Sequence, residues 1–272
     1  MSKIVLITGA SSGMGLATSK YLADNNFIVY ATSRDINKLS NLNNSNIIPL
    51  SMDITSQESI NRALDIIYNK HKRVDVLINN AGYGLVSTIE DMDEDEMLSQ
   101  YNVNVFGLLR VCKATIGIMR KQNSGVIINI SSFLGKIGLP LLTLYNSSKY
   151  AVEGITDSLR HELKDFNIRV HSVLPGFFDT QFARDNLITN LQTFDKNSAY
   201  AKLVSNLAPA IVKQINNGND AQEVALMILE IINNDKFVAR ATVGDKAKKF
   251  LPMRKELSDE DFERRVRQYY NI

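Results

Sequence analysis

The chain has 272 residues, a formal net charge of +2 and 44% hydrophobic residues. These values are typical of a folded globular protein, and they exclude a disordered chain, a collagen-like repeat and a disulfide-stapled mini-protein. The balance of 31 basic and 29 acidic residues leaves no basic excess with which to hold a nucleic-acid backbone. Cys112 is the one cysteine, and no apolar run reaches the roughly 18 residues of a membrane span. We therefore expect a cytoplasmic protein with no nucleic-acid partner and no membrane span.

Short apolar segments alternate with longer helical segments along the chain. The apolar segments are rich in Val and Ile, which predicts strands that are buried on both faces of a parallel sheet. The expected strands span residues 3–8, 27–32, 47–51, 74–79, 125–131, 168–174 and 237–243. The expected helices include residues 13–25, 56–71, 93–122, 145–166 and 220–233. This alternation predicts a Rossmann-type, doubly wound α/β fold with about seven parallel strands and helices on both faces.

The sequence shows neither a repeat nor a linker, so we expect one dinucleotide-binding catalytic domain over residues 1–272. Residues 177–219 show no clear strand pattern and are expected to form an insertion that acts as a substrate lid. We expect this lid to be mobile without ligand and to close over substrate. The polar segment 245–272 is expected to be a helical C-terminal extension whose charged residues form a solvated face.

A glycine-rich turn follows the first predicted strand. It reads Thr8-Gly9-Ala10-Ser11-Ser12-Gly13-Met14-Gly15. Glycines let a backbone turn sharply and approach a ligand, and the N-terminus of the following helix offers free N–H groups to a phosphate. The turn is not a Walker loop, because no Lys-Ser/Thr pair follows its last glycine. The sequence therefore predicts a dinucleotide site here, with a glycine turn that binds no ligand as the alternative.

The end of the second predicted strand bears on the choice between NAD and NADP. It reads Tyr30-Ala31-Thr32-Ser33-Arg34-Asp35. An NAD enzyme places an acid at this strand end to bind the ribose 2′-hydroxyl, whereas Arg34 can hold a 2′-phosphate through its planar guanidinium. Asp35 is expected to lie beyond the ribose. We therefore predict NADP(H) as the cofactor, with a purely surface role for Arg34 as the alternative.

Further motifs follow in a defined order along the chain. They are Asp53, Asn79-Asn80-Ala81-Gly82, Ser132, Tyr145-x-x-x-Lys149 and Pro175-Gly176. Together with the glycine turn, they resemble the compact branch of the short-chain dehydrogenase/reductase family over about residues 3–243. The segment 31–34 looks like the NADP-preferring group of that branch. The stretch Gly138-Leu139-Pro140 and the tail are similar to its steroid- and retinoid-dehydrogenase-like members.

The resemblance implies a cofactor-binding role for residues that match the family's positions. They are Gly9, Ser11, Ser12, Gly13, Met14, Gly15, Ser33, Arg34, Asp53, Ile54, Asn80, Ala81, Gly82, Tyr145, Lys149, Pro175, Gly176, Phe178 and Thr180. Asp53 and Ile54 match the pair that meets the adenine, and Thr180 matches the residue that binds the nicotinamide carboxamide. Ser12 departs from the pattern, because many NADP-preferring relatives carry Lys or Arg there. Arg34 is then the main expected contact to the 2′-phosphate.

The resemblance also implies that Asn104, Ser132, Tyr145 and Lys149 are the catalytic residues. Tyr145 and Lys149 are i and i+4 of an expected helix, so they share one helix face. An ammonium about 4 Å from the phenol would favour the phenolate by about 4 kcal/mol at an effective dielectric near 20. Ser132 would donate a hydrogen bond to the substrate oxygen. The three histidines show no metal-ligand spacing, so no metal site is expected.

These residues predict an oxidoreductase that transfers a hydride between NADP(H) and a carbonyl compound or secondary alcohol. An apolar ketone or aldehyde is the expected substrate, because apolar side chains gather in the segments after the strands. They are Leu85, Phe133, Leu134, Leu139, Leu141, Leu142, Phe177, Phe178, Phe182 and Leu187. The alternatives are an NAD-preferring dehydrogenase, a small pocket closed by these side chains, and a dinucleotide-binding sensor without turnover. Segment 105–119 is apolar on nearly every face, which predicts a homodimer or homotetramer.

Overall fold

The structure is a computed structural model that describes residues 2–180 and 187–272. Its centre is a seven-stranded sheet with the strand order β11-β7-β6-β4-β1-β2-β3, in which all neighbours are parallel. The strands are β1 (Ile4–Ile7), β2 (Ile28–Ser33), β3 (Ile47–Ser51), β4 (Val76–Asn79), β6 (Gly125–Ile130), β7 (Ile168–Pro175) and β11 (Arg240–Val243). The predicted doubly wound fold is therefore confirmed, with β11 shorter than its expected range.

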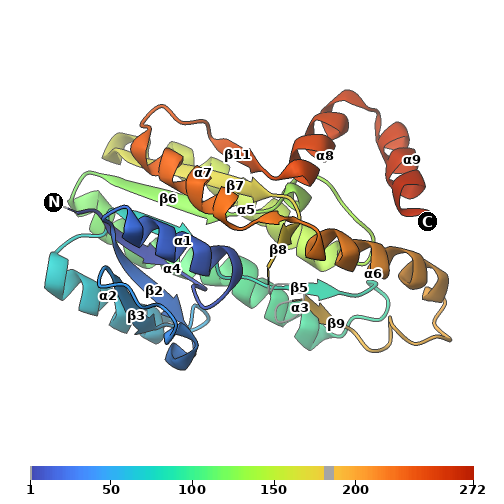
Figure 1. The fold of residues 1–272 in the computed structure, drawn as a ribbon, viewed down its shortest axis with the longest axis horizontal. Coiled ribbons are helices and arrows are strands. Elements are labelled where there is room, and N and C mark those ends of the chain that lie inside the picture. The colour runs from blue at the N-terminus through green and yellow to red at the C-terminus, as the bar shows by residue number, and fades with distance from the viewer. Residues whose placement is uncertain (1, 181–186) are drawn as a thin grey trace.

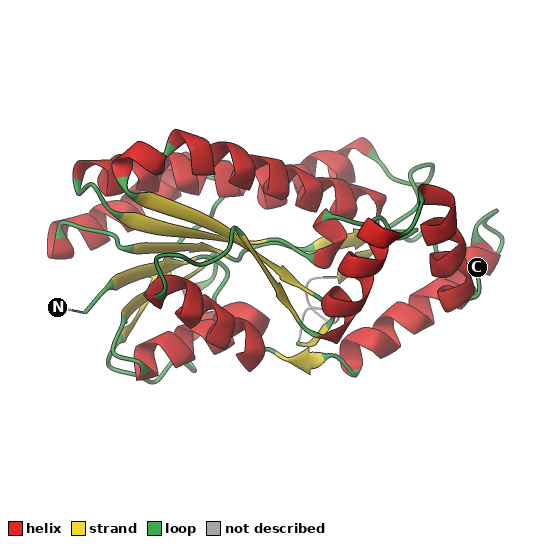
Figure 2. Ribbon diagram, turned by 90° about the horizontal axis from the view of Figure 1, so that it is seen from above, coloured by secondary structure: helices red, strands yellow, loops and turns green. Residues whose placement is uncertain are grey.

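Two layers of helices cover the sheet (Figure 2). The helices are α1 (Gly13–Asp24), α2 (Gln57–His71), α3 (Glu94–Tyr101), α4 (Leu108–Lys121), α5 (Thr143–Glu162), α6 (Ala201–Asn216), α7 (Gln222–Asn233), α8 (Asp245–Glu256) and α9 (Asp259–Tyr270). Helices α1 and α7 pack on one face of the sheet, and α2, α4 and α5 pack on the other. Both faces of the central strands are buried, because their side chains meet a helix layer on each side.

The helix expected over residues 93–122 is divided in the structure. Helix α3 runs into a π-helical turn at Asn102–Gly107, and α4 follows it. Gly107 permits this arrangement, because a Cβ there would lie 2.7 Å from Ile54 Cδ1. Single π turns inside helices are rare and occur often at functional sites. Here the turn places Asn104 at the carboxyl ends of the strands.

The expectation that residues 177–219 hold no strand is wrong. Short strands β8 (Phe178–Asp179), β9 (Leu187–Thr189) and β10 (Asn219–Asp220) lie there, and α6 connects the last two. Strand β9 pairs with β5 (Gly84–Val86), and β10 pairs with β8. Strands of two or three residues are too short to show a period, and distant pairing determines them. Phe182, which was expected in the apolar pocket, lies outside the described residues.

The C-terminal extension is only partly the solvated helix that the sequence predicts. Figure 1 shows α6, α8 and α9 beyond one end of the sheet, with the C-terminus far from the N-terminus. Phe250, Phe262, Val266 and Tyr270 are buried there against α6 and against Phe133, which follows β6. The charged residues of the extension face outward, so its polar composition conceals an apolar face.

Candidate active site

The glycine turn after β1 is built by close contacts between backbones. Gly9 has a φ of +66°, and a Cβ there would lie 2.8 Å from Ala81 Cα. The side-chain amide of Asn80 donates to the carbonyl oxygens of Thr8 at 3.0 Å and Gly9 at 2.8 Å. The backbone N–H groups of Asn80 and Ala81 both donate to the Thr8 hydroxyl at 3.0 Å. The turn and the Asn80-Ala81-Gly82 segment therefore form one rigid unit.

The N-terminus of α1 fits a pyrophosphate. Ser12 precedes the helix in an extended conformation and its side chain makes no capping hydrogen bond, while the first turn carries no acid. The helix therefore offers its N–H groups and its partial positive charge to an anion. Gly13 has a φ of +53°, and a Cβ there would lie 3.3 Å from Thr180 Cβ. Thr180, the expected carboxamide contact, thus lies beside the turn.

The end of β2 exposes one charged side chain, Arg34, and engages the next, Asp35, in a hydrogen bond. The Asp35 carboxylate accepts a hydrogen bond from the Asn37 backbone at 3.0 Å and so caps the short 3₁₀ helix Ile36–Leu39. Arg34 is exposed beside the buried end of β2 at Ser33. The Asp53 carboxylate accepts from the Thr55 N–H and hydroxyl at 2.8 and 2.7 Å, which shapes the turn that holds buried Ile54.

Ser132, Tyr145 and Lys149 come together where β6 and α5 approach. Ser132 precedes the 3₁₀ turn Phe133–Gly135, and its hydroxyl forms a hydrogen bond with the Tyr145 side chain. Lys149 Nζ lies 5.7 Å from the centroid of the Tyr145 ring and donates to the Ile130 carbonyl at 2.9 Å. Lys149 is buried. The spacing of four residues on α5 therefore places both side chains on the helix face that meets the strand ends.

Burial determines the titration of these two groups. It raises the pKa of the Tyr145 phenol to about 12, although the hydrogen bond from Ser132 lowers it. Burial lowers the pKa of the Lys149 ammonium to about 8, while the Glu153 carboxylate raises it. In the protein alone, the expected lowering of the Tyr145 pKa is not seen, because desolvation of the phenolate raises this pKa.

Asn104 supports the site from the π-helical turn. Its side-chain amide donates to the Tyr83 carbonyl at 2.8 Å and to the Ser148 hydroxyl at 3.1 Å, and its carbonyl oxygen accepts from the Tyr83 N–H at 3.0 Å. A Cβ on Gly82 would lie 3.2 Å from Asn104 Oδ1 and 3.8 Å from Lys149 Nζ. Asn104 therefore joins the loop after β4 to helix α5.

A mostly apolar cleft of about 70 Å³ has Ser132 and Tyr145 in its lining. Expected cofactor residues line one part of it: Met14, Pro175, Gly176, Phe178 and Thr180. Apolar side chains line another part: Phe133, Leu134, Leu142, Phe177, Leu187, Ile211 and Ile215. Of the expected pocket residues, Leu85, Leu139 and Leu141 are buried outside this lining.

The cleft is also lined by Ile211 and Ile215 of α6, which the sequence did not predict there. Their i, i+4 spacing marks one apolar face of a helix and was visible in the sequence. Nothing in that spacing places α6 over the cleft. The helix reaches that position because Leu207 and Ile211 are buried against the C-terminal extension.

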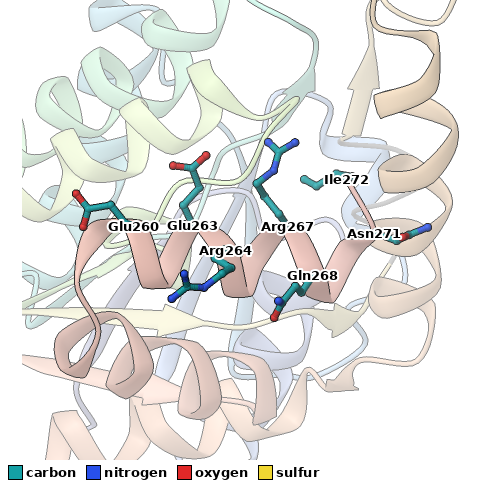
Figure 3. A pocket seen from close by; sticks show the side chains of 7 residues that line it. All are labelled: Glu260, Glu263, Arg264, Arg267, Gln268, Asn271 and Ile272. Atoms are coloured by element: carbon teal, nitrogen blue, oxygen red, sulfur yellow. The ribbon is translucent and has the colours of Figure 1, made fainter.

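A second hollow, of about 490 Å³, lies along α9. Figure 3 shows that its lining residues all come from α9 and the last two residues, with Glu263 and Arg267 pointing to the same side. It shares no lining residue with the catalytic cleft, and charges of both signs line it. Across residues 2–180 and 187–272, no cluster of metal-ligating side chains occurs. No helix within these same ranges is long and apolar enough to cross a membrane.

Comparison with known proteins identifies the family. A model of the short chain dehydrogenase family matches residues 3–190. A 3-ketodihydrosphingosine reductase of Bacteroides thetaiotaomicron is 37% identical over 257 residues, which cover 92% of this chain and 93% of that protein. The chain belongs to the short-chain dehydrogenase/reductase family. A probable short-chain type dehydrogenase/reductase of Helicobacter pylori, VdlC, is 31% identical over 92% of this chain and 91% of its own length.

Solved structures of short-chain dehydrogenases have the same fold. A short-chain dehydrogenase from Streptomyces avermitilis superposes with a TM-score of 0.84 at 29% identity, covering 100% of this chain and 96% of that one. The protein ElxO, solved with NADP bound, superposes with a TM-score of 0.74 at 26% identity, covering 89% of this chain and 97% of that one. The chain is thus a short-chain oxidoreductase with a nicotinamide cofactor, while its place among steroid- and retinoid-dehydrogenase-like members stays a prediction.

Proposed function

We propose that this short-chain oxidoreductase reduces an apolar ketone or aldehyde with NADPH, and oxidises the corresponding alcohol in reverse. The observation that carries this proposal is the position of Ser132 and Tyr145 in the lining of an apolar cleft, beside expected cofactor residues. Apolar clefts with few polar groups bind apolar ligands and orient them through those groups. No cluster of Lys or Arg lines the described part of this cleft, which disfavours phosphorylated substrates.

The proposed mechanism assigns one task to each side chain. The nicotinamide cofactor supplies the hydride when it is bound. Tyr145 then donates its proton to the carbonyl oxygen, and the raised pKa of its phenol keeps that proton in place at neutral pH. Ser132 donates a hydrogen bond to the same oxygen. The Lys149 ammonium then favours the Tyr145 phenolate that remains. Asn104 fixes the position of α5 relative to the loop after β4 through its hydrogen bonds to Ser148 and Tyr83.

NADP(H) is the proposed cofactor because Arg34 is the side chain at the end of β2 that can bind a 2′-phosphate. One oxygen of the Asp35 carboxylate is engaged as a helix cap, so this side chain is less available to a ribose. ElxO, which is 26% identical, was solved with NADP bound. The second candidate is an NAD-preferring dehydrogenase, and it is favoured by Ser12, which carries no cation for the 2′-phosphate.

The proposed substrate class includes long-chain ketones. The Bacteroides relative is named for reduction of 3-ketodihydrosphingosine, and the alignment with it covers 92% of this chain. Ile211 and Ile215 belong both to the cleft lining and to the buried apolar cluster that α6 forms with the C-terminal extension. Methylene groups of a substrate would bury their surface against the cleft lining, at about 0.8 kcal/mol for each group.

The decisive experiment is NADPH oxidation over a panel of ketones and aldehydes of increasing apolar size. The proposal expects kcat/KM to rise with chain or ring size. Preference for small polar or phosphorylated carbonyls would overturn the proposed substrate class. Tight binding of NADPH with no turnover of any carbonyl compound would favour the sensor alternative instead.

We propose assembly as a homodimer or homotetramer through the outer face of α4 and the preceding turn. Phe106 is 47% exposed and Leu109 is 38% exposed there, while Lys113 is also exposed. A two-fold axis across this face would bury both apolar side chains. Light scattering at micromolar concentration should show an oligomer, and Leu109→Glu should convert it to a monomer. Location in the cytoplasm remains a prediction from the sequence.

A further inference from the structure

A buried carboxylate lies on α5 one turn beyond Lys149. Glu153 is 2% exposed and does not line the cleft. Its Oε2 atom accepts a hydrogen bond from Arg240 Nε at 2.6 Å and lies 3.6 Å from Lys136 Nζ. Its Oε1 atom makes no hydrogen bond with any described residue. Both cations therefore lie on the same carboxylate oxygen.

The partners of Glu153 come from separate elements that meet behind the catalytic residues. Lys136 directly follows the 3₁₀ turn that begins after Ser132, and Arg240 begins β11. Arg240 also bonds Asp157, one helical turn further along α5, at 2.5 Å. Glu153 therefore connects α5 to the turn that carries Ser132 and to the last strand of the sheet.

Gly135 allows this turn to lie directly against α5. A Cβ at Gly135 would lie 2.8 Å from Ser131 Oγ, 2.9 Å from the Lys149 carbonyl oxygen and 3.1 Å from Glu153 Cγ. Distances this short leave no room for a side chain. The turn after Ser132, the backbone of Lys149 and the side chain of Glu153 therefore form one packed group.

Glu153 is linked to Lys149 by charge as well as by packing. The two residues are i and i+4 on α5, where Cβ atoms lie about 5–6 Å apart. Both side chains are buried, so solvent and salt screen their interaction only weakly. The Glu153 carboxylate raises the pKa of Lys149 against the effect of burial.

We propose that Glu153 is a positioning residue for hydride transfer: its carboxylate keeps Lys149 charged and holds the Ser132 turn against α5. Glu153 acts through these residues, since it does not line the cleft. The groups that face it are Lys149 and Asp157 on α5, Lys136 after the turn and Arg240 on β11. This inference rests on the proposed function, because it concerns the charge of the proposed catalytic lysine.

The test is the pH profile of kcat for ketone reduction in Glu153→Gln, beside the wild type. Gln keeps the shape of Glu and removes its charge, so Lys149 should lose its proton at lower pH. The alkaline limb of the profile should therefore move down by about 1 pH unit, while the KM for NADPH changes by less than about twofold. A substitution that only loosened the fold would lower activity without moving this limb.

Asp157→Asn is the matched control. It removes a carboxylate from the same arginine on the same helix, but the Asp157 side chain is 51% exposed. We expect its pH profile to match that of the wild type. An equal shift in both variants would overturn the proposal, because Arg240 and not Glu153 would then determine the profile.

A second variant, Lys136→Met, should shift the alkaline limb of the pH profile in the opposite direction. Removing this cation leaves the Glu153 carboxylate less compensated, so the alkaline limb should move to higher pH. The shift should be smaller, because the Lys136 side chain is 37% exposed and screened by solvent. If Glu153→Gln does not fold, this variant decides the question, and an unmoved limb overturns the proposal. A wild type that reduces no carbonyl compound would instead overturn the proposed function.

Discussion

The nucleotide half and the substrate lobe of this molecule are held together in different ways. The nucleotide half, β1 to β4 with α1 and α2, depends on backbone contacts such as the approach of Gly9 to Ala81 and the Asn80 hydrogen bonds to the turn. The substrate lobe is formed by α6, α8, α9 and the turn after Ser132. It depends on an apolar cluster in which the ring centroids of Phe133 and Phe177 lie 5.2 Å apart.

This difference explains why the nucleotide half carries a recognisable sequence motif and the substrate lobe does not. A backbone contact at a positive φ is satisfied by glycine and by little else, so the residue type is fixed. An apolar cluster can be rebuilt from many combinations of side chains of similar volume. We therefore expect substitutions in the lobe to change substrate preference and substitutions in the nucleotide half to change cofactor binding.

The proposed catalytic residues lie where the two halves meet, so we expect their loss to have the largest effect. In Tyr145→Phe the ring keeps its packing and the proton donor is removed. We expect kcat to fall by at least about 100-fold, with NADPH binding retained by fluorescence titration. Tyr150→Phe is the control, because Tyr150 lies on the same helix and is 47% exposed. Near wild-type turnover by Tyr145→Phe would contradict the assignment.

The cofactor preference tests the nucleotide half alone. Arg34→Ala should weaken NADPH binding by about 1–3 kcal/mol, the contribution of a charge-assisted hydrogen bond, and leave NADH binding nearly unchanged. Asp35→Ala removes the neighbouring charge, whose carboxylate caps a 3₁₀ helix, and should leave the ratio of the two dissociation constants as it is. Equal losses for both cofactors in Arg34→Ala would show that Arg34 does not meet the 2′-phosphate.

The substrate lobe is tested on α6. Ile211 is 2% exposed and lines the cleft, whereas the next residue, Val212, is 43% exposed. Ile211→Ala should lower kcat/KM for the largest ketones by about tenfold and for small ones far less. Val212→Ala should change neither value. If Ile211→Ala affected NADPH binding more than ketone preference, the division of the molecule into two halves would fail.

The sequence predicted the sheet, its two helix layers and the elements that carry the catalytic residues. These features depend on local signals: Val-rich strands, glycines at forced backbone positions and an i, i+4 pair on a helix. The cofactor and catalytic roles of individual residues stay predictions, although the structure brings Ser132, Tyr145 and Lys149 together.

The features that the sequence did not predict depend on contacts between distant residues. Strand β9 exists because it pairs with β5, about a hundred positions earlier in the chain. Phe250 and Tyr270 are buried in an apolar cluster with α6 and the turn after Ser132, although charged residues lie near them in the sequence. No proline marks the interruption of the helix near Asn104, and Gly107 alone does not predict a π turn in a sequence.

A third kind of stabilisation appears at the far edge of the sheet, where β7 meets β11. His171 on β7 is 2% exposed. Its Nδ1 atom lies 2.8 Å from the Val238 carbonyl, and its Nε2 atom lies 3.3 Å from Arg169 Nη1. These partners require a neutral ring that donates from Nδ1 and accepts at Nε2. Protonation would direct a second N–H group at the Arg169 guanidinium.

This edge should therefore weaken in acid, which is the smallest of the expected effects. Burial is the main cause that lowers the pKa of His171, and the charge of Arg169 lowers it further. As the pH falls below about 6.5, the unfolded chain binds a proton that the folded chain resists. The free energy of unfolding should then drop by at most about 1.4 kcal/mol per pH unit.

The variant His171→Gln tests this expectation by urea unfolding from pH 7 to pH 5. It should be less stable than the wild type at pH 7, but its stability should depend less on pH. The exposed His161 provides the control, because His161→Gln should keep the wild-type slope. If the free energy of unfolding of His171→Gln fell with pH as steeply as that of the wild type, groups other than His171 would cause the acid sensitivity.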